Sequence, residues 1–341
     1  MNENNQLTMK DIARLLGVSV ATVSRALKDS PSISRDQREK IQQFARDHNY
    51  YPNQLAATLR KSKVRPQKVI GVIIPQFTHY YFASILTGIE EVASERSYRI
   101  IVATSAEKYE KEVAICESFF QIKVCGVIVS QAKDTVNYSH FKHLIDHGIP
   151  IVFYDRICAG INCSRVVVDD YQGSYKAVNY LIEHGCKRIA FFGSPLNMEI
   201  SKNRYNGYKD ALYHNGMSVD KSLAFICDNR SDAERITPYV LSKKDRPDGF
   251  FAVNDETAIG ILHAAKRLGF SIPDQASICG FTNSNNAEVC DPMLTTVEQR
   301  GKDVGREAAG ALIDQVEGII PMDKVVRRIV KTRLVVRGTT R

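Results

Sequence analysis

A short segment near the N-terminus carries side chains that could read a nucleic acid. The helix expected over residues 20–27 exposes small side chains and one arginine, which are Val20, Ala21, Thr22, Ser24 and Arg25. Small residues let a helix approach the major groove closely, and an arginine there can donate two hydrogen bonds to O6 and N7 of guanine. The segment therefore predicts contact with DNA bases. The alternative is an ordinary helical hairpin with a solvated face.

A second set of polar side chains follows apolar runs in the rest of the chain. These runs lead into His79–Phe82, Asp155-Arg156, Asn254-Asp255 and Thr282-Asn283. Ligands of open parallel sheets bind beyond the carboxyl ends of the strands, so we expect these clusters to share one site. Aromatic rings, a carboxylate and amides suit a small polyhydroxylated ligand. Each acidic or amide residue, taken singly, could instead cap a helix, and it is their joint position that favours a binding site.

The motifs of several enzyme classes are missing from the sequence. It contains no G-x-G-x-x-G after an apolar run, no phosphate-binding G-x-x-x-x-G-K-[ST] and no G-x-S-x-G. The histidines do not have metal-ligand spacing, and the eight cysteines include no C-x-x-C pair. We therefore predict no catalytic residue, no metal and no cofactor. An enzyme with a dispersed site is the alternative.

The DNA-reading residues need a scaffold, and residues 8–27 have the pattern of two helices joined by a tight turn. Thr8 can cap the first helix, with Asp11 as its acidic partner. Gly17 ends this helix, because glycine adopts a left-handed conformation at little cost. Ser19 then caps the second helix. The apolar stripe of the first helix is expected to consist of Ile12, Leu15 and Leu16.

A third helix from Ser34 would close a small core, and residues 6–52 are expected to form one domain. Its buried face is expected to be Ile41, Phe44 and Ala45. Residues 1–68 contain 13 Lys and Arg against 6 Asp and Glu, a net of +7, whereas the whole chain carries +8. The positive charge thus lies on one small unit, as expected for a module that neutralises phosphates.

Residues 53–68 are expected to be a hinge helix and linker. Asn53–Arg60 spans about two turns, which is too short for a helix to be stable alone in water, so it should be helical only with a partner. Leu59 could then insert between base steps in a minor groove. Alternatively, it is a linker residue that contacts the next domain.

From residue 69 onward, short apolar runs alternate with amphipathic helical segments. This alternation is typical of parallel sheets with helices on both faces, and the runs suffice for two doubly wound units. We expect a core over residues 69–341 with one subdomain of about 69–165 plus 296–320. The other would comprise about 166–293 plus 321–341. A helix over 301–317 and a strand over 328–337 are expected to connect the two halves.

The sequence also bears on where the protein acts. Its first residues contain no apolar signal-peptide core, and no run of about 18 apolar residues could span a membrane. Most of the cysteines lie in apolar stretches, as reduced core thiols do. We therefore expect a cytoplasmic protein with no membrane partner.

Several motifs together resemble the LacI/GalR family of bacterial transcription regulators, over about Thr8 to Arg337. The N-terminal matches are Val18-Ser19-x-x-Thr22-Val23-Ser24-Arg25, Pro52-Asn53 and Leu59-Arg60. The later matches are Ser201-x-x-Arg204-x-x-Gly207-Tyr208, Phe251-Ala252-x-Asn254-Asp255, Gly280-Phe281 and Pro292-x-Leu294-Thr295-Thr296-Val297-x-Gln299. The combination is specific, although no single motif is.

The resemblance implies an all-α helix-turn-helix headpiece and an α/β core similar to periplasmic sugar-binding proteins. It implies a homodimer on a near-palindromic double-stranded operator, acting as a repressor that is switched by a sugar or sugar derivative. Bases would be contacted by Val20, Ala21 and Arg25, and phosphates, or bases in part, by Thr8, Ser19, Thr22 and Ser24. The hinge contacts would come from Asn53, Ala56, Leu59 and Arg60, with Leu59 at the central minor-groove step. The effector cleft between the subdomains would be lined by Tyr81, Asp155, Arg204, Asn254 and Thr282.

Two positions depart from the family pattern. Thr282 stands where an acidic residue is usual, and Asn229 stands near the place of a common aromatic residue. Two effector classes therefore stay open: an acidic or phosphorylated ligand paired with Arg204, or a neutral sugar held by other residues. Arg204 could also be structural. A sugar-binding protein without a DNA role is the alternative function, which residues 8–60 do not fit.

Overall fold

The computed structural model describes residues 7–48, 50, 68–158 and 160–341, and the chain divides into two compact units, 1–67 and 68–341. The hinge helix expected over residues 53–60 lies outside the described residues. So do the contacts expected of Asn53, Ala56, Leu59 and Arg60.

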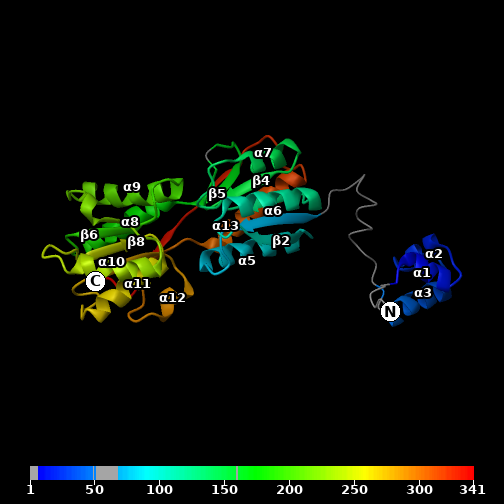
Figure 1. Ribbon diagram of the computed structural model, residues 1–341, viewed down its shortest axis with the longest axis horizontal. Coiled ribbons are helices and arrows are strands. Elements are labelled where there is room, and N and C mark those ends of the chain that lie inside the picture. Colours follow the sequence, from blue (N-terminus) through cyan, green and yellow to red (C-terminus); the bar gives the residue numbers. More distant parts are fainter. Residues whose placement is uncertain (1–6, 49, 51–67, 159) are drawn as a thin grey trace. The chain divides into compact units, whose positions relative to one another are not determined.

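The N-terminal unit contains the three expected helices, α1 (Met9–Leu15), α2 (Val20–Ala26) and α3 (Arg35–Asp47) (Figure 1). The capping box is confirmed, since the hydroxyl of Thr8 accepts from the Asp11 amide and the Asp11 carboxylate accepts from the Thr8 amide at 3.0 Å. Gly17 has a φ of +64° and makes the turn after α1. Ser19 caps α2 by accepting a 3.1 Å hydrogen bond from the amide of Thr22. Each of these local signals thus produces the predicted structure.

The core of the N-terminal unit differs from the prediction at one position. Its fully buried side chains are Ile12, Ala13, Val23, Ala26, Ile41 and Ala45. Leu15 was expected to belong to the buried stripe, but it is 57% exposed. The stripe instead runs through Ile12, Ala13 and the half-buried Leu16, because α2 and α3 close the core on that side of α1. Helical periodicity predicts a stripe but does not decide which edge of it the neighbouring helices cover.

The second unit contains two six-stranded sheets, each at the centre of one lobe. In spatial order, the first sheet consists of β11 (Arg327–Val330), β5 (Ser164–Val168), β4 (Ile151–Tyr154), β3 (Gly126–Val129), β1 (Val69–Ile74) and β2 (Arg99–Thr104). The second consists of β12 (Arg333–Val335), β10 (Thr295–Glu298), β9 (Ser277–Thr282), β8 (Gly249–Ala252), β6 (Ile189–Gly193) and β7 (Ala224–Ile226). All neighbours are parallel except β12, which runs antiparallel to β10. The doubly wound architecture is confirmed.

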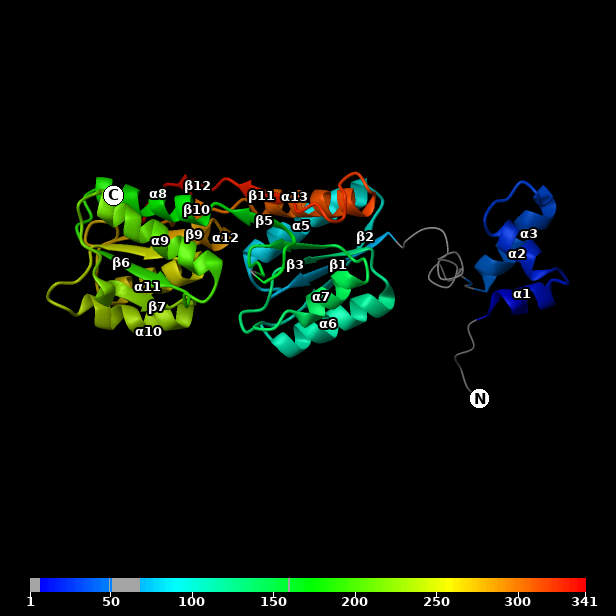
Figure 2. The ribbon, with the colours of Figure 1, turned by 90° about the horizontal axis from the view of Figure 1, so that it is seen from above.

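Helices cover both faces of each sheet (Figure 2). In the first lobe, α5 (Tyr80–Glu95) and α13 (Gly301–Val316) cover one face, and α6 (Tyr109–Ile122) and α7 (Ser139–Asp146) cover the other. In the second lobe, α8 (Asp170–Glu183) and α9 (Glu199–His214) lie opposite α10 (Arg230–Leu241) and α11 (Asp255–Arg267). A short helix, α12 (Asn285–Val289), and a 3-10 turn (Lys221–Leu223) complete the second lobe. Because the strands are covered on both sides, their sequences read as continuous apolar runs.

Two glycines let α5 and α13 touch at their backbones. A Cβ added at Gly88 would lie 2.0 Å from the carbonyl oxygen of Lys302, and one added at Gly305 would lie 2.1 Å from that of Ile85. Any side chain at these positions would push the two helices apart. The glycines therefore set the spacing of this helix pair.

The expected exchange of segments between the subdomains is wrong in detail. The single strand expected over 328–337 is two strands, of which β11 pairs with β5 in the first sheet and β12 with β10 in the second. The boundary expected at 296 also fails, because β10 pairs with β9 and belongs to the second lobe. Sheet membership depends on pairing between strands that are far apart in the chain, which a local apolar pattern does not encode.

Candidate functional site

The exposed face of α2 presents the side chains that were predicted to read DNA. Val20 is 39% exposed, Ala21 and Arg25 are exposed, and Thr22 and Ser24 are half-buried. The hydroxyls of Ser19 and Thr22 lie 2.8 Å apart and hold the start of the helix. Within residues 7–48, Arg25 forms no ion pair, so its guanidinium is available to a ligand.

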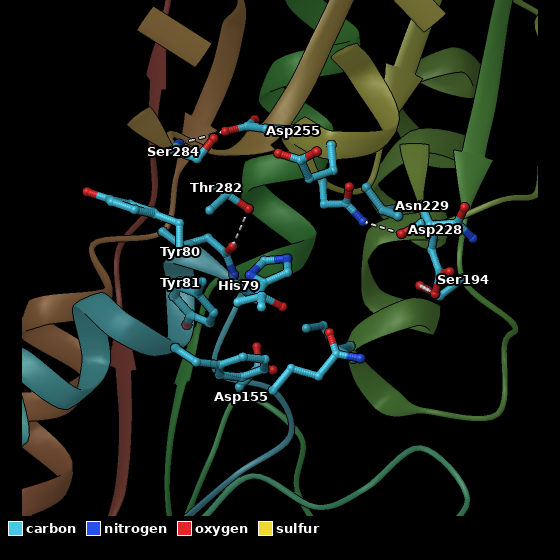
Figure 3. Close-up of a pocket in the computed structure, with 18 of the residues that line it drawn as sticks. His79, Tyr80, Tyr81, Asp155, Ser194, Asp228, Asn229, Asp255, Thr282 and Ser284 are labelled. Carbon is cyan, nitrogen blue, oxygen red and sulfur yellow. Dashed lines mark hydrogen bonds between the residues drawn. The ribbon is translucent and has the colours of Figure 1, made fainter. Parts of the chain in front are cut away.

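The second unit contains a cavity of about 900 Å³. All five residues predicted for the effector cleft lie on its wall, which is formed by Tyr81, Asp155, Arg204, Asn254 and Thr282 among others. Figure 3 shows Tyr81, Asp155 and Thr282 around this space. Tyr81 belongs to the first lobe, and Asp155 directly follows β4, whereas Arg204 lies on α9 of the second lobe. The cavity therefore lies between the two lobes and beyond the ends of their strands.

Several buried polar groups on the cavity wall have no protein partner. Among the described residues, no hydrogen bond reaches the Tyr81 hydroxyl, Nδ1 of His79 or the hydroxyl of Ser284. Tyr81 is only 3% exposed. A buried polar group without a partner costs about 1–3 kcal/mol, so these groups take their hydrogen bonds from what fills the cavity, which is water or a bound ligand.

Asp155 is the central charged group on this wall. It is 7% exposed and has a φ of +57°, a strained backbone conformation for aspartate. Its Oδ2 lies 3.9 Å from Nε of Arg156, whose Nη1 donates a 2.6 Å hydrogen bond to Glu107. Burial raises the pKa of the Asp155 carboxyl, and the nearby charges of Arg156, Arg204 and His79 oppose this rise. No side chain in the described part of the protein donates a hydrogen bond to this carboxylate.

Arg204 has a different environment from the one that an anion-binding role requires. It is 7% exposed, and its Nε and Nη2 both lie 2.8 Å from Oδ1 of Asp170. Its Nη1 donates a 2.6 Å hydrogen bond to the carbonyl of Val253, and its guanidinium carbon lies 3.9 Å from the centre of the Phe281 ring. The guanidinium is thus held and neutralised by the protein itself.

Asn254 and Thr282 are also engaged with the protein. The Asn254 side chain accepts from the amide of Thr257 at 2.8 Å, and so caps α11, and it donates to the carbonyl of Asp228 at 2.8 Å. Thr282 donates a 3.0 Å hydrogen bond to Gln299. Both residues line the cavity, but their first hydrogen bonds serve the fold.

Further cavity residues follow other strands that sequence reasoning did not inspect. Lys133 in the first lobe donates a 2.8 Å hydrogen bond to Asp228 in the second, and Ser194 donates to the same oxygen at 2.9 Å. Burial raises the pKa of Asp228, but the hydrogen bonds from Lys133 and Ser194 and the charges of Lys133 and Arg156 outweigh it and hold the pKa below its usual value. Ser194 follows β6 and Asp228 follows β7. The rule that ligands bind beyond the carboxyl ends of parallel strands therefore finds both residues when it is applied to these two apolar runs.

Metal clusters, membrane-spanning helices and disulfides are absent from the described residues. No group of three or more His, Cys, Asp or Glu among the described residues could hold a metal ion. None of the described helices is long and apolar enough to cross a membrane. The eight cysteines are free thiols, five of them buried.

Comparison with known proteins gives consistent matches at both ends of the chain. Residues 8–53 match the family described as "Bacterial regulatory proteins, lacI family", and residues 178–340 match "Periplasmic binding protein-like domain". The HTH-type transcriptional repressor CytR of Escherichia coli K12 is 30% identical over 337 residues, which are 98% of this chain and 96% of CytR. The ribose operon repressor of Halalkalibacterium halodurans is 32% identical over 335 residues, 98% of this chain and 97% of that repressor. The structure of a transcriptional regulator CelR-cellobiose complex superposes with a TM-score of 0.74 at 25% identity, covering 98% of this chain and 99% of that one.

Proposed function

The chain belongs to the LacI family of bacterial regulatory proteins and is a DNA-binding transcriptional regulator; from this premise, we propose that it is a cytoplasmic repressor that a small carbohydrate-like effector controls. It would act as a homodimer on a near-palindromic operator. Its full-length similarity to two proteins named as repressors supports the sign of regulation. A cellobiose complex among its structural relatives supports a carbohydrate-like effector. We propose no catalytic activity.

The operator contacts follow from the exposed face of α2. Arg25, which has no ion pair within residues 7–48, would donate to a guanine, and Val20 and Ala21 would pack against neighbouring base edges. Hydroxyl contacts to phosphate or bases would come from Thr8, Ser19, Thr22 and Ser24. Minor-groove contacts would come from the segment that includes Asn53, Ala56, Leu59 and Arg60.

The observation that carries the effector site is the set of unpaired polar groups on the cavity wall. Tyr81, His79 and Ser284 each bring a buried group without a protein partner, and Asp155 brings a buried carboxylate that receives no side-chain hydrogen bond from the described residues. Effector hydroxyls would satisfy these groups. Arg204, Asn254 and Thr282 would shape the wall around them.

Effector and operator would be coupled through the arrangement of the two lobes. A ligand that binds one arrangement better shifts the protein toward it, by as much as its affinities for the two differ. The factor by which bound effector changes the affinity for the operator equals the factor by which bound operator changes the affinity for the effector. Inducer and corepressor both satisfy this relation.

Operator binding tests the proposal directly. An operator is selected from a random duplex library with the full chain, and its affinity is measured by titration. Arg25→Ala should weaken this affinity by about 1–3 kcal/mol and relax the preference at one base pair. Arg235→Ala is the control, because it removes an equal charge from a pair with Asp232 in the second unit. Unchanged specific affinity in Arg25→Ala would show that α2 does not read the operator.

A further inference from the structure

The charges on the cavity wall narrow the class of effector, provided that the cavity is the effector site as proposed above. We propose that the cavity takes an uncharged, hydroxyl-rich ligand, such as a free sugar or nucleoside, and rejects the phosphorylated form of the same molecule. The partners of the charged side chains on the wall determine this selectivity.

The two most buried cations of the wall are already neutralised. Arg204 shares its charge with Asp170 at 2.8 Å, and both side chains are at least nine-tenths buried. Arg156 donates to Glu107 at 2.6 Å, with side-chain exposures of 12% and 17%. A phosphate could use either arginine only by displacing a carboxylate, which would leave that carboxylate buried without a cation.

The two cations nearer solvent are paired as well. Lys133 lies 2.8 Å from Asp228, and Arg230 lies 3.2 Å from Glu234. The guanidinium of Arg230 also donates a 2.8 Å hydrogen bond to Nδ1 of His263 on α11. These four residues are the Lys and Arg side chains of the described cavity wall. The wall therefore offers an incoming anion no cation free of a carboxylate or imidazole partner.

One buried carboxylate of the wall has only a distant cation beside it. Asp155 is 7% exposed, and its Oδ2 lies 3.9 Å from Nε of Arg156, whose guanidinium binds Glu107 at 2.6 Å. A phosphate monoester carries about −1.5 to −2 charges at pH 7 and would lose its hydration close to this carboxylate. A ligand hydroxyl, in contrast, can donate to Asp155 in a charge-assisted hydrogen bond.

The unpaired groups beside Asp155 complete the pattern. The hydroxyls of Tyr81 and Ser284 can each donate and accept, and Nδ1 of His79 can do either, depending on its tautomer. A polyol with adjacent hydroxyls matches such groups, because each of its hydroxyls is also donor and acceptor. None of these three groups is an arginine or a lysine, the side chains that pair with a phosphate by charge.

Matched ligand pairs test the proposal. The full chain is titrated with a library of free sugars, sugar alcohols and nucleosides and, for each compound, its monophosphate, at constant ionic strength. Binding is measured by thermal shift and calorimetry, with inorganic phosphate as the anion control. We expect at least one neutral compound to bind and its monophosphate to bind with at least tenfold lower affinity. Inorganic phosphate should show no binding.

Two carboxylate variants make the test specific. Asp155→Asn should weaken the neutral ligand at least tenfold and shrink its advantage over the monophosphate, since the repelling charge is gone. Glu256→Gln is the matched control at the same cavity, because its carboxylate already accepts a 2.7 Å hydrogen bond from Asn286. If Asp155→Asn does not fold, the salt dependence of the wild type replaces it, and a neutral ligand should bind equally at low and high salt.

The outcomes separate this inference from the proposed function. A library in which only phosphorylated compounds bind, or bind more tightly than their neutral partners, overturns the inference and leaves the effector role of the cavity standing. A library in which nothing binds overturns the effector role itself, and the inference falls with it.

Discussion

Replacing Arg204 by methionine should destabilise the second lobe far more than the same change at the surface. Methionine keeps much of the apolar volume next to Phe281, but it removes every hydrogen bond of the guanidinium. Asp170, which is 5% exposed, would then be a buried carboxylate without a cation, and the carbonyl of Val253 would lose the donor that lies 2.6 Å from it. The variant therefore breaks a buried ion pair from one side.

The expected loss of stability follows from these contacts. Removing one partner of a buried ion pair costs about 3–5 kcal/mol, because the other charge stays buried. Burial raises the pKa of Asp170 to about 6 even though Arg204 opposes the rise. Without Arg204 this pKa rises further, so the carboxyl becomes neutral at a higher pH. The cost of Arg204→Met should thus be largest at neutral pH and should shrink as the pH falls through the raised pKa.

Two further variants identify the source of the loss. Arg235→Met is the surface control, because Arg235 pairs with Asp232 at 2.9 Å while its side chain is 72% exposed, and it should cost at most about 1 kcal/mol. The double variant Arg204→Met, Asp170→Asn removes both charges and should recover more than half of the loss. With the single variant Asp170→Asn added, the two single variants, the double variant and the wild type form a double-mutant cycle.

Urea unfolding followed by far-ultraviolet circular dichroism measures these stabilities, since the chain has no tryptophan for fluorescence. The m-value, which scales with the surface exposed on unfolding, should be the same in all variants. A loss below about 1 kcal/mol for Arg204→Met, indistinguishable from Arg235→Met, would refute the structural role. It would instead favour an arginine that waits for an anionic ligand.

Three further outcomes are expected. Gly88→Ala should lower the free energy of unfolding in urea by about 3 kcal/mol, since its Cβ would lie 2.0 Å from a carbonyl oxygen of α13. Gly310→Ala on α13 is the control and should be neutral or stabilising, because its Cβ meets nothing closer than 4.0 Å. Equal effects of the two changes would contradict the close helix contact. A carbodiimide should join Lys133 to Asp228 by an amide bond that peptide mass spectrometry detects. Lys133→Arg should abolish this cross-link. A missing cross-link in the wild type would argue against lobes that meet at this pair. Binding of a neutral ligand should weaken as the pH falls, and the weakening should begin above the usual carboxyl range because burial raises the pKa of Asp155. Asp155→Asn should remove this pH dependence. An unchanged pH profile in the variant would mean that another group titrates.

Much of the architecture follows from local sequence. Thr8, Asp11, Gly17 and Ser19 act within a few residues of themselves, so their capping and turn roles can be read from the sequence and appear in the structure. The apolar runs of the core likewise became strands, because a strand buried on both faces needs an uninterrupted apolar stretch. The strand-end rule also placed Tyr81 and Asp155 on one cavity, since parallel strands end at the same edge.

The partners of these side chains were beyond the sequence. Arg204 could be read as an anion-binding residue until Asp170, on the neighbouring helix α8, was seen to neutralise it. Leu15 belonged to a plausible apolar stripe until the packing of α2 and α3 left it exposed.

The sequence by itself determined the helices of the headpiece, the alternation that makes two doubly wound lobes, and the family. Only the tertiary structure decided that β11 and β12 lie in different sheets and that Lys133 meets Asp228 across the cavity. It also decided that the buried carboxylate of Asp155 receives no side-chain hydrogen bond from the described residues. The physical reason is range: caps, turns and hydrophobic periodicity act between residues a few positions apart. Sheet pairing, desolvation and ion pairing depend on which distant segments the fold brings together.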